Sequence, residues 1–351
     1  MPGLKVYTHI SSPLSSMALE TLQSRRVNAR YATHLAACLS AFVSWSILHN
    51  FPHPSKLVHS PRHIADQLIK YVEYLYREGR AFSVAKLTVL SLQNKYRHLK
   101  GNLQAAWDLL VTWQLELPLR MRTPMPEDIL WGLFSTAMMF AFVWDRSHVR
   151  DWLGFGIGMI TMFWGLLRPG ELYRLSTRLI QTVGATAYAP ARALLVVERA
   201  KNQRTMGKSQ IAIVSHVVVF RWLNWLTASL QPKELLFRGG GQKIRRLMAQ
   251  CLERLSIPLN VFTPASFRAG GATALFVSGT EVARLGLIGR WRSTASLDHY
   301  IQEAASTMVS LSLPPTALQV TRKLVSDSSF LRHPPLAPAL ATIRLLRRQH
   351  G

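Results

Sequence analysis

Two long apolar runs, residues 129–144 and 152–167, constrain the fold of this chain more than any other feature. Each is shorter than the ~20 residues that a membrane-spanning helix requires. Charged residues between Asp145 and Asp151 also separate the two runs. We therefore expect two buried helices at the centre of a globular core. A membrane-associated protein built on these runs is the alternative, and detergent-free fractionation separates the two cases.

The charge balance points to a polyanionic partner. The 351 residues include 42 Lys and Arg against 18 Asp and Glu, which gives a net charge of +24. Such a surface should bind polyanions, of which nucleic acid is the commonest inside cells. The two cysteines are too few for a disulfide framework and lack zinc-binding spacing, so we expect an intracellular protein. The histidines at 49–63 lie near prolines and have no acidic or cysteine ligand beside them, so we predict no metal.

The first part of the chain reads as a leader followed by helices. Residues 1–60 form a leader of unclear role, whose few acids and several serines also suit an organelle-targeting sequence. Ser60 and Pro61 then resemble a helix start, and apolar residues recur at helical spacing as far as Gly79. Further helices are expected at 84–99 and 103–115. Residues 61–117 thus predict a small bundle of helices. Its basic residues at expected exposed positions are the candidates for contacting a nucleic acid: Lys86, Lys95, Arg97 and Lys100.

The second part of the chain predicts a mainly α-helical domain with a small sheet. Prolines stiffen a linker at 118–126, and the domain itself spans 127–312. The β-branched runs 193–198 and 211–219 flank a polar tip at 201–208, which is a hairpin pattern. Helices should follow as far as about residue 310. Residues 313–351 form a basic C-terminal tail.

Four segments of the second domain carry residues suited to chemistry on a phosphate. They read GLLRPGEL (165–172), TPASFRAGGAT (263–273), IGRW (288–291) and LDHYI (297–301). The first alone would suggest only a helix end with a local ion pair. In the second, five small residues follow the arginine, so a close approach by backbone or ligand is expected there.

In these segments the chain resembles the tyrosine recombinases, the phage-type integrases. The resemblance covers residues 61–312 and implies a helical, SAM-like core-binding domain followed by a catalytic domain. It assigns Arg168 and Arg268 as the two catalytic arginines, Trp291 as the His/Trp position, and Tyr300 as the nucleophile. Glu171 matches the acidic partner of Arg168.

The resemblance is weaker at two positions. The catalytic lysine of the hairpin tip is best matched by Lys201, with Lys208 as second choice and Arg204 as a competitor; Arg204 and Lys208 are expected to bind DNA in any case. The family's histidine, three residues before the second arginine, is Ala265 here. His299 adjoins the tyrosine, but neighbouring helix residues diverge by about 100°, so we do not expect it to replace the missing histidine.

The resemblance implies DNA breaking and rejoining by a tyrosine nucleophile. Forked hydrogen bonds from Arg168 and Arg268 would hold the phosphate, the indole of Trp291 would add a donor, and Lys201 would protonate the departing oxygen. Because a 3′-phosphotyrosine conserves the bond energy, no cofactor is predicted. The partner would be double-stranded DNA, bound by a homotetramer on two sites, without a membrane, in the nucleus or nucleoid. A mobile-element origin is what the family most often implies.

Three other interpretations remain. A recombinase-derived DNA-binding protein with weak or no catalysis is motivated by Ala265. A type IB-like topoisomerase would share the chemistry without exchanging strands. The membrane-associated protein is the third.

Overall fold

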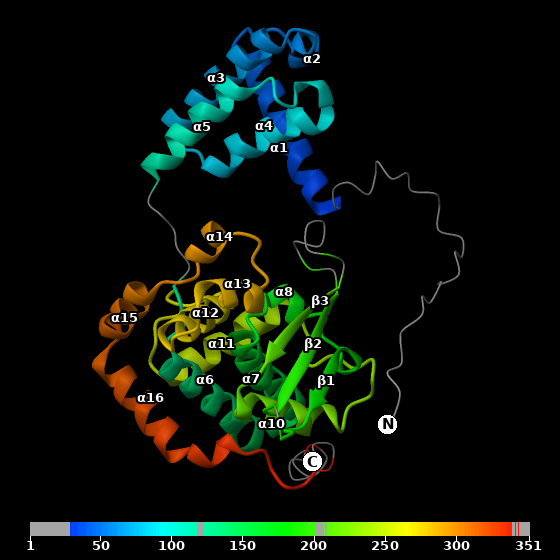
Figure 1. Cartoon of the computed structure of the whole chain (residues 1–351). Coiled ribbons are helices and arrows are strands. Elements are labelled where there is room, and N and C mark those ends of the chain that lie inside the picture. The colour runs from blue at the N-terminus through cyan, green and yellow to red at the C-terminus, as the bar shows by residue number, and fades with distance from the viewer. Residues whose placement is uncertain are drawn as a thin grey trace, which may run out of the picture. The chain divides into compact units, whose positions relative to one another are not determined.

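The protein is described here by a computed structural model (Figure 1). It describes residues 29–117, 123–187, 189–198, 200, 207, 209–338, 341 and 343. The chain divides into two compact units, Met1–Arg120 and Met121–Gly351. Each unit has its own hydrophobic core. Helices dominate the described residues of both units, and the sheet among them lies in the second unit. The expected fold class, mainly α with a small sheet, is confirmed.

The first unit is a helical bundle that begins earlier than the sequence indicated. Its core includes Phe42 and Trp45 of the first helix, packed with Ile64, Leu68 and Leu92 of later helices. The structure therefore differs from the expected division at residue 60, because residues from 29 onward share the core of the bundle. The helical elements are α1 (Ala29–Leu48), α2 (Pro54–Leu57), α3 (Pro61–Arg77), α4 (Phe82–Lys95), the 3₁₀ turn η2 (Arg97–Leu99) and α5 (Gln104–Glu116).

Helix α3 shows how local sequence sets the ends of an element. Pro61 occupies its first turn, where the missing N–H costs nothing. Ser60 stands at the N-cap position, but its hydroxyl contacts His63 Nδ1 at 2.5 Å instead of capping the backbone. After the helix, Gly79 adopts a left-handed φ of 62°, and its N–H bonds to the Tyr76 carbonyl. Among the described helices, α1 is the one that is long and apolar enough to cross a membrane.

The second unit is built around the two apolar runs. The first run forms α6 and a π-helical turn, η3, and the second forms α7, which is buried along most of its length. The expectation of two buried core helices is confirmed. The elements up to the sheet are α6 (Glu127–Met139), η3 (Phe140–Trp144), η4 (Arg146–His148), α7 (Val149–Trp164), α8 (Pro169–Leu172) and η5 (Thr177–Leu179).

The sheet has three antiparallel strands in the order β1-β2-β3. β2 and β3 form the expected hairpin, with Ala193 opposite Val214. β1 was not predicted; it adds to β2, with Ile180 opposite Leu195. Alternate residues of β2 and β3 are buried, so one face of the sheet covers the core. The strands are β1 (Ile180–Val183), β2 (Arg192–Glu198) and β3 (Ser209–Val214).

The last third of the chain closes the core. Helix α16 packs on α6, and Leu313 and Ala317 belong to the core of the second unit. The region expected to be a tail from residue 313 therefore begins as part of the folded unit. The elements are α10 (Val217–Thr227), α11 (Gly241–Arg254), α12 (Ser266–Val277), α13 (Val282–Gly289), α14 (Thr294–Asp298), α15 (Glu303–Ser312), α16 (Pro315–Asp327) and η6 (Ser329–Arg332).

Candidate active site

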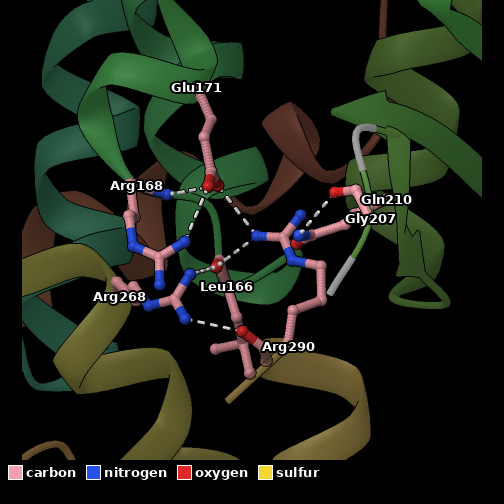
Figure 2. A network of polar contacts seen from close by, with 8 residues as sticks. Leu166, Arg168, Glu171, Gly207, Gln210, Arg268 and Arg290 are labelled. Carbon is pink, nitrogen blue, oxygen red and sulfur yellow. Dashed lines mark hydrogen bonds and ion pairs between the residues drawn. The ribbon is translucent and has the colours of Figure 1, made fainter. Parts of the chain in front are cut away.

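The four motif segments meet in the second unit. Arg168 precedes α8, Arg268 lies on α12, and Trp291 follows α13. Tyr300 lies in a turn two residues beyond α14. Figure 2 shows the guanidinium groups of Arg168, Arg268 and Arg290 converging around Glu171 and the carbonyl oxygen of Leu166. The structure thus brings together residues that lie more than a hundred positions apart.

Arg168 and Glu171 form a compact local pair at the start of α8. Glu171 accepts the backbone N–H of Arg168 at 2.9 Å and its Nη1 at 2.8 Å. Pro169 starts the short helix, which fixes the turn between the two residues. The Arg168 side chain keeps 21% exposure whereas that of Glu171 keeps 2%. The carboxylate therefore orients the arginine from the buried side and leaves it open to a ligand.

A second arginine, Arg290, contacts the same carboxylate. Its Nη2 lies 2.8 Å from Glu171 Oε2 and 3.2 Å from the Leu166 carbonyl oxygen. Burial by itself raises the pKa of the Glu171 carboxyl, but the charge of Arg290 and the backbone N–H of Arg168 outweigh it, so the net pKa is below its usual value. Arg290 was not predicted as a site residue, although it stands directly before Trp291.

Arg268 is fully buried and held by backbone and rings. Its Nη1 donates to the Leu166 carbonyl and its Nη2 to the Gly289 carbonyl at 2.6 Å. Its guanidinium carbon lies 4.3 Å from the centroid of the Trp291 ring and 5.4 Å from that of Tyr300. Burial, followed by the charges of the other two arginines, lowers its pKa. A bound anion would relieve that repulsion.

Trp291 and Tyr300 pack against each other, with ring centroids 5.0 Å apart. Trp291 Nε1 is buried, and in the described part of the chain it has no hydrogen-bond partner. Tyr300 is half-buried and is held through its main chain: its N–H donates to the Leu297 carbonyl at 2.7 Å, and its own carbonyl lies 3.0 Å from Thr273 Oγ1. The phenol is thus placed beside Arg268 by its backbone.

Glycines permit the close approaches that this packing needs. A Cβ on Gly271 would lie 2.0 Å from the Phe163 carbonyl oxygen, and one on Gly270 would lie 2.1 Å from that of Met125. The small residues after Arg268 therefore let α12 contact the backbone of neighbouring segments, as the sequence indicated. At Gly289, a Cβ would collide with the Trp291 ring, 1.6 Å from its nearest atom.

Other predicted site residues fall outside this cluster or outside the described chain. Ala265 occupies the turn just before α12 and is half-buried. Its neighbour Ser266 accepts the Thr263 N–H at 3.1 Å, so that hydroxyl already holds the turn. His299 is exposed. The hairpin-tip residues Lys201, Arg204 and Lys208 lie outside the described residues.

The predicted DNA-contacting residues of the first unit are all at its surface. They lie on α4 and the turn that follows it, and all four are exposed: Lys86, Lys95, Arg97 and Lys100. Across the residues that the structure describes, no group of three or more His, Cys, Asp or Glu side chains could hold a metal ion.

Solved structures of a transposon integrase and of recombinases are similar to this chain. The site-specific recombinase XerH, bound to its difH substrate, matches with a TM-score of 0.50 and 12% identity, over 80% of this chain and 78% of that chain. XerA recombinase matches with a TM-score of 0.37 and 16% identity, over 88% and 94%. The Tn1549 transposon integrase, in complex with a circular intermediate DNA, matches with a TM-score of 0.47 and 12% identity, over 80% and 99%. No family model and no curated protein sequence matches the chain. The similarity to XerH shows that this chain has the fold of the tyrosine recombinases, the family that its motif segments resemble.

Proposed function

We propose that this protein is a site-specific DNA recombinase or integrase that cleaves and rejoins DNA through a 3′-phosphotyrosine intermediate. The observation that carries the proposal is the placement of Tyr300 beside the buried guanidinium of Arg268, with Arg168 nearby and partly exposed. The XerH structure contains its DNA substrate, which supports DNA as the partner here. The net charge of +24 suits such a partner.

The proposed reaction uses each group in a distinct way. Tyr300 Oη attacks the phosphorus and loses its proton to water, forming a P–O bond to the enzyme while the bond from phosphorus to the 5′ oxygen breaks. Arg168 and Arg268 bind the nonbridging oxygens, on which negative charge accumulates. Trp291 Nε1, which is buried and has no acceptor among the residues that the structure describes, donates to one of them. Lys201 protonates the departing 5′ oxygen.

Rejoining reverses these steps. A 5′ hydroxyl, of the same or another strand, attacks the phosphotyrosine, and Tyr300 leaves as the phenol. No external energy is needed because the phosphodiester is exchanged rather than hydrolysed. We further propose that the active species is a homotetramer on two DNA sites, because strand exchange requires two duplexes to be cut in one assembly. Sedimentation on DNA measures that assembly.

The decisive experiment is covalent trapping on DNA taken from the flanks of this protein's own gene. Nicked, labelled duplexes are incubated with the wild type or Tyr300→Phe and then separated under denaturing conditions. The proposal expects a denaturant-resistant adduct with the wild type alone. Adduct formation by Tyr300→Phe would assign another nucleophile. Relaxation of any supercoiled plasmid, whatever its sequence, would favour a type IB-like topoisomerase.

A catalytically weakened or inactive DNA-binding protein is the second candidate, and Ala265 is the observation that favours it. The family's histidine is absent at that position, and Ser266, its neighbour, already bonds to the turn. This candidate predicts salt-sensitive DNA binding without any adduct.

A further inference from the structure

We infer that Arg290 is a positioning residue that sets the net charge of the active centre: it neutralises Glu171, which leaves the charge of Arg168 available to the scissile phosphate. This inference rests on the function proposed above. Arg290 is not one of the residues that the family resemblance assigned. Its guanidinium contacts the Glu171 carboxylate and the Leu166 carbonyl oxygen (Figure 2).

The ion pair geometry is the first support. Each carboxylate oxygen of Glu171 has its own guanidinium: Oε1 contacts Arg168 Nη1 and Oε2 contacts Arg290 Nη2, both at 2.8 Å, while Oε2 also accepts the backbone N–H of Arg168. The Arg290 side chain keeps 4% exposure against 21% for Arg168. Charge pairs interact more strongly where water is excluded. The buried Arg290 therefore takes the larger share of the Glu171 charge, and the more exposed Arg168 remains positive toward solvent.

The backbone of Arg290 is the second, independent support. Its φ of 59° lies in the left-handed region, at the position after α13 where helices usually place glycine. A residue with a Cβ is strained there, and such strain persists where the side chain has a function. Glycine would fit this turn better. The arginine side chain, which reaches Glu171, accounts for the exception.

The charge balance indicates what the arrangement is for. The three guanidiniums of Arg168, Arg268 and Arg290 face the single carboxylate of Glu171, which leaves an excess of two positive charges. A phosphodiester carries one negative charge, and the five-coordinate transition state of tyrosine attack carries two. The excess therefore matches the transition state better than the ground state, which is the condition for catalysis. Without Arg290, Arg168 and Glu171 would form a neutral pair.

A double-mutant cycle that removes each charge in turn tests this inference. The variants are Arg290→Gly, Glu171→Gln and the double variant Arg290→Gly/Glu171→Gln. Glycine suits the left-handed turn, and glutamine can still accept the Arg168 N–H, so both substitutions spare the local backbone. The two readouts are the affinity for inorganic phosphate, measured by calorimetry, and the single-turnover rate of adduct formation on nicked DNA.

We expect Arg290→Gly to weaken phosphate binding about tenfold and to slow adduct formation about a hundredfold. Adding Glu171→Gln should restore at least tenfold of the lost rate and most of the phosphate affinity, since it removes the charge that Arg290 balanced. For Arg290→Lys, the phosphate affinity and the rate of adduct formation should both stay within tenfold of the wild-type values. A merely structural role predicts that the second substitution adds further damage, and that result would overturn the inference.

Arg254→Gln is the matched control, because it removes one guanidinium from the same unit, where Arg254 lies over the rings of Phe140 and Trp144. Arg254→Gln should leave the phosphate affinity and the rate of adduct formation within twofold of the wild-type values. The phosphate cycle needs no DNA site. If the wild type formed no adduct on any duplex, the proposed function would fail while the phosphate measurements would still decide the role of Arg290.

Discussion

Arg268 and Trp291 lie in a stacked arrangement in which the guanidinium carbon is 4.3 Å from the ring centroid. The same guanidinium donates to two backbone carbonyls, so its position is fixed by contacts on several sides. A cation held in this way needs little reorganisation when it binds a phosphate, which is the source of strong electrostatic catalysis. The indole of Trp291 thus serves both packing and, in the proposed reaction, hydrogen bonding.

These two contributions of Trp291 can be separated by Trp291→Phe. The phenyl ring retains most of the contact with Arg268 and Tyr300 but lacks the indole N–H. We expect the free energy of unfolding to change by less than about 1.5 kcal/mol, because the swap is between hydrophobic rings and removes an unpaired buried donor. Adduct formation should slow by about a hundredfold. An unchanged rate would show that the N–H does not reach the phosphate.

Ala265→His should raise the rate of adduct formation. Position 265 lies at the turn before α12, is half-buried, and stands three residues before Arg268, where the resemblance places the family's histidine. One restored donor is worth about a hundredfold in comparable sites. The measurement is single-turnover trapping beside the wild type, with Ala265→Asn as a control for added bulk. An equal gain from asparagine would point to packing instead of proton transfer.

Gly271→Ala should destabilise the second unit by more than about 3 kcal/mol, because its Cβ would collide with the Phe163 carbonyl 2.0 Å away. Gly286→Ala is the matched control within α13: nothing lies within 4 Å of its added Cβ. Alanine there should stabilise by about 0.5–1 kcal/mol. Urea unfolding of both variants gives the comparison. Equal stability would mean that α12 can move away from α7 without loss.

Stability should fall in mild acid because of His216. Its ring stacks on Trp164, with centroids 4.4 Å apart, and burial lowers its pKa below the usual value near 6.5. The unfolded chain therefore binds a proton more readily, and the stability that neutral His216 provides is lost as the pH falls through 6.5 toward the lower folded pKa. His216→Phe should flatten the melting temperature between pH 7 and 5. If the melting temperature of His216→Phe depended on pH as that of the wild type does, a group other than His216 would cause the loss of stability in acid.

The exposed lysines of the first unit should supply phosphate contacts. Lys86→Gln/Lys100→Gln should weaken DNA binding about equally on all sequences and reduce the slope of log affinity against log salt by about 2. The measurement is fluorescence anisotropy over a salt series. A control substitution at exposed Arg77, which pairs with Glu73 at 3.9 Å, tests whether any lost surface charge has the same effect. A slope near that of the wild type would place the DNA contacts elsewhere.

Much of the fold could be predicted from local pattern. The two apolar runs became buried α6 and α7, and the β-branched runs became a hairpin, because burial and pairing follow directly from hydrophobic period. Strand β1 was missed, since Ile180–Val183 is short and gains its stability from β2 rather than from its own residues. Helix α1 was left in the leader because its partner, α4, lies far along the sequence.

The site was predictable where a residue type implies its chemistry, and less so where a residue acts through another. Arg168 and Glu171 are three residues apart in sequence, so their pairing was expected, and the structure shows it. Arg290 was not identified because its partner stands far away in sequence and its φ is invisible in a string of letters. Only the folded chain shows that its side chain turns toward Glu171.

Leu166 has a structural role that its apolar side chain does not suggest. It has a left-handed φ of 48°, and its carbonyl oxygen accepts from both Arg268 and Arg290. Rotation of this one peptide plane would withdraw an acceptor from both arginines at once. Each arginine also has an anchor of its own, the Gly289 carbonyl for Arg268 and the Glu171 carboxylate for Arg290. The orientation of one peptide group thus couples the positions of two guanidiniums that come from different elements.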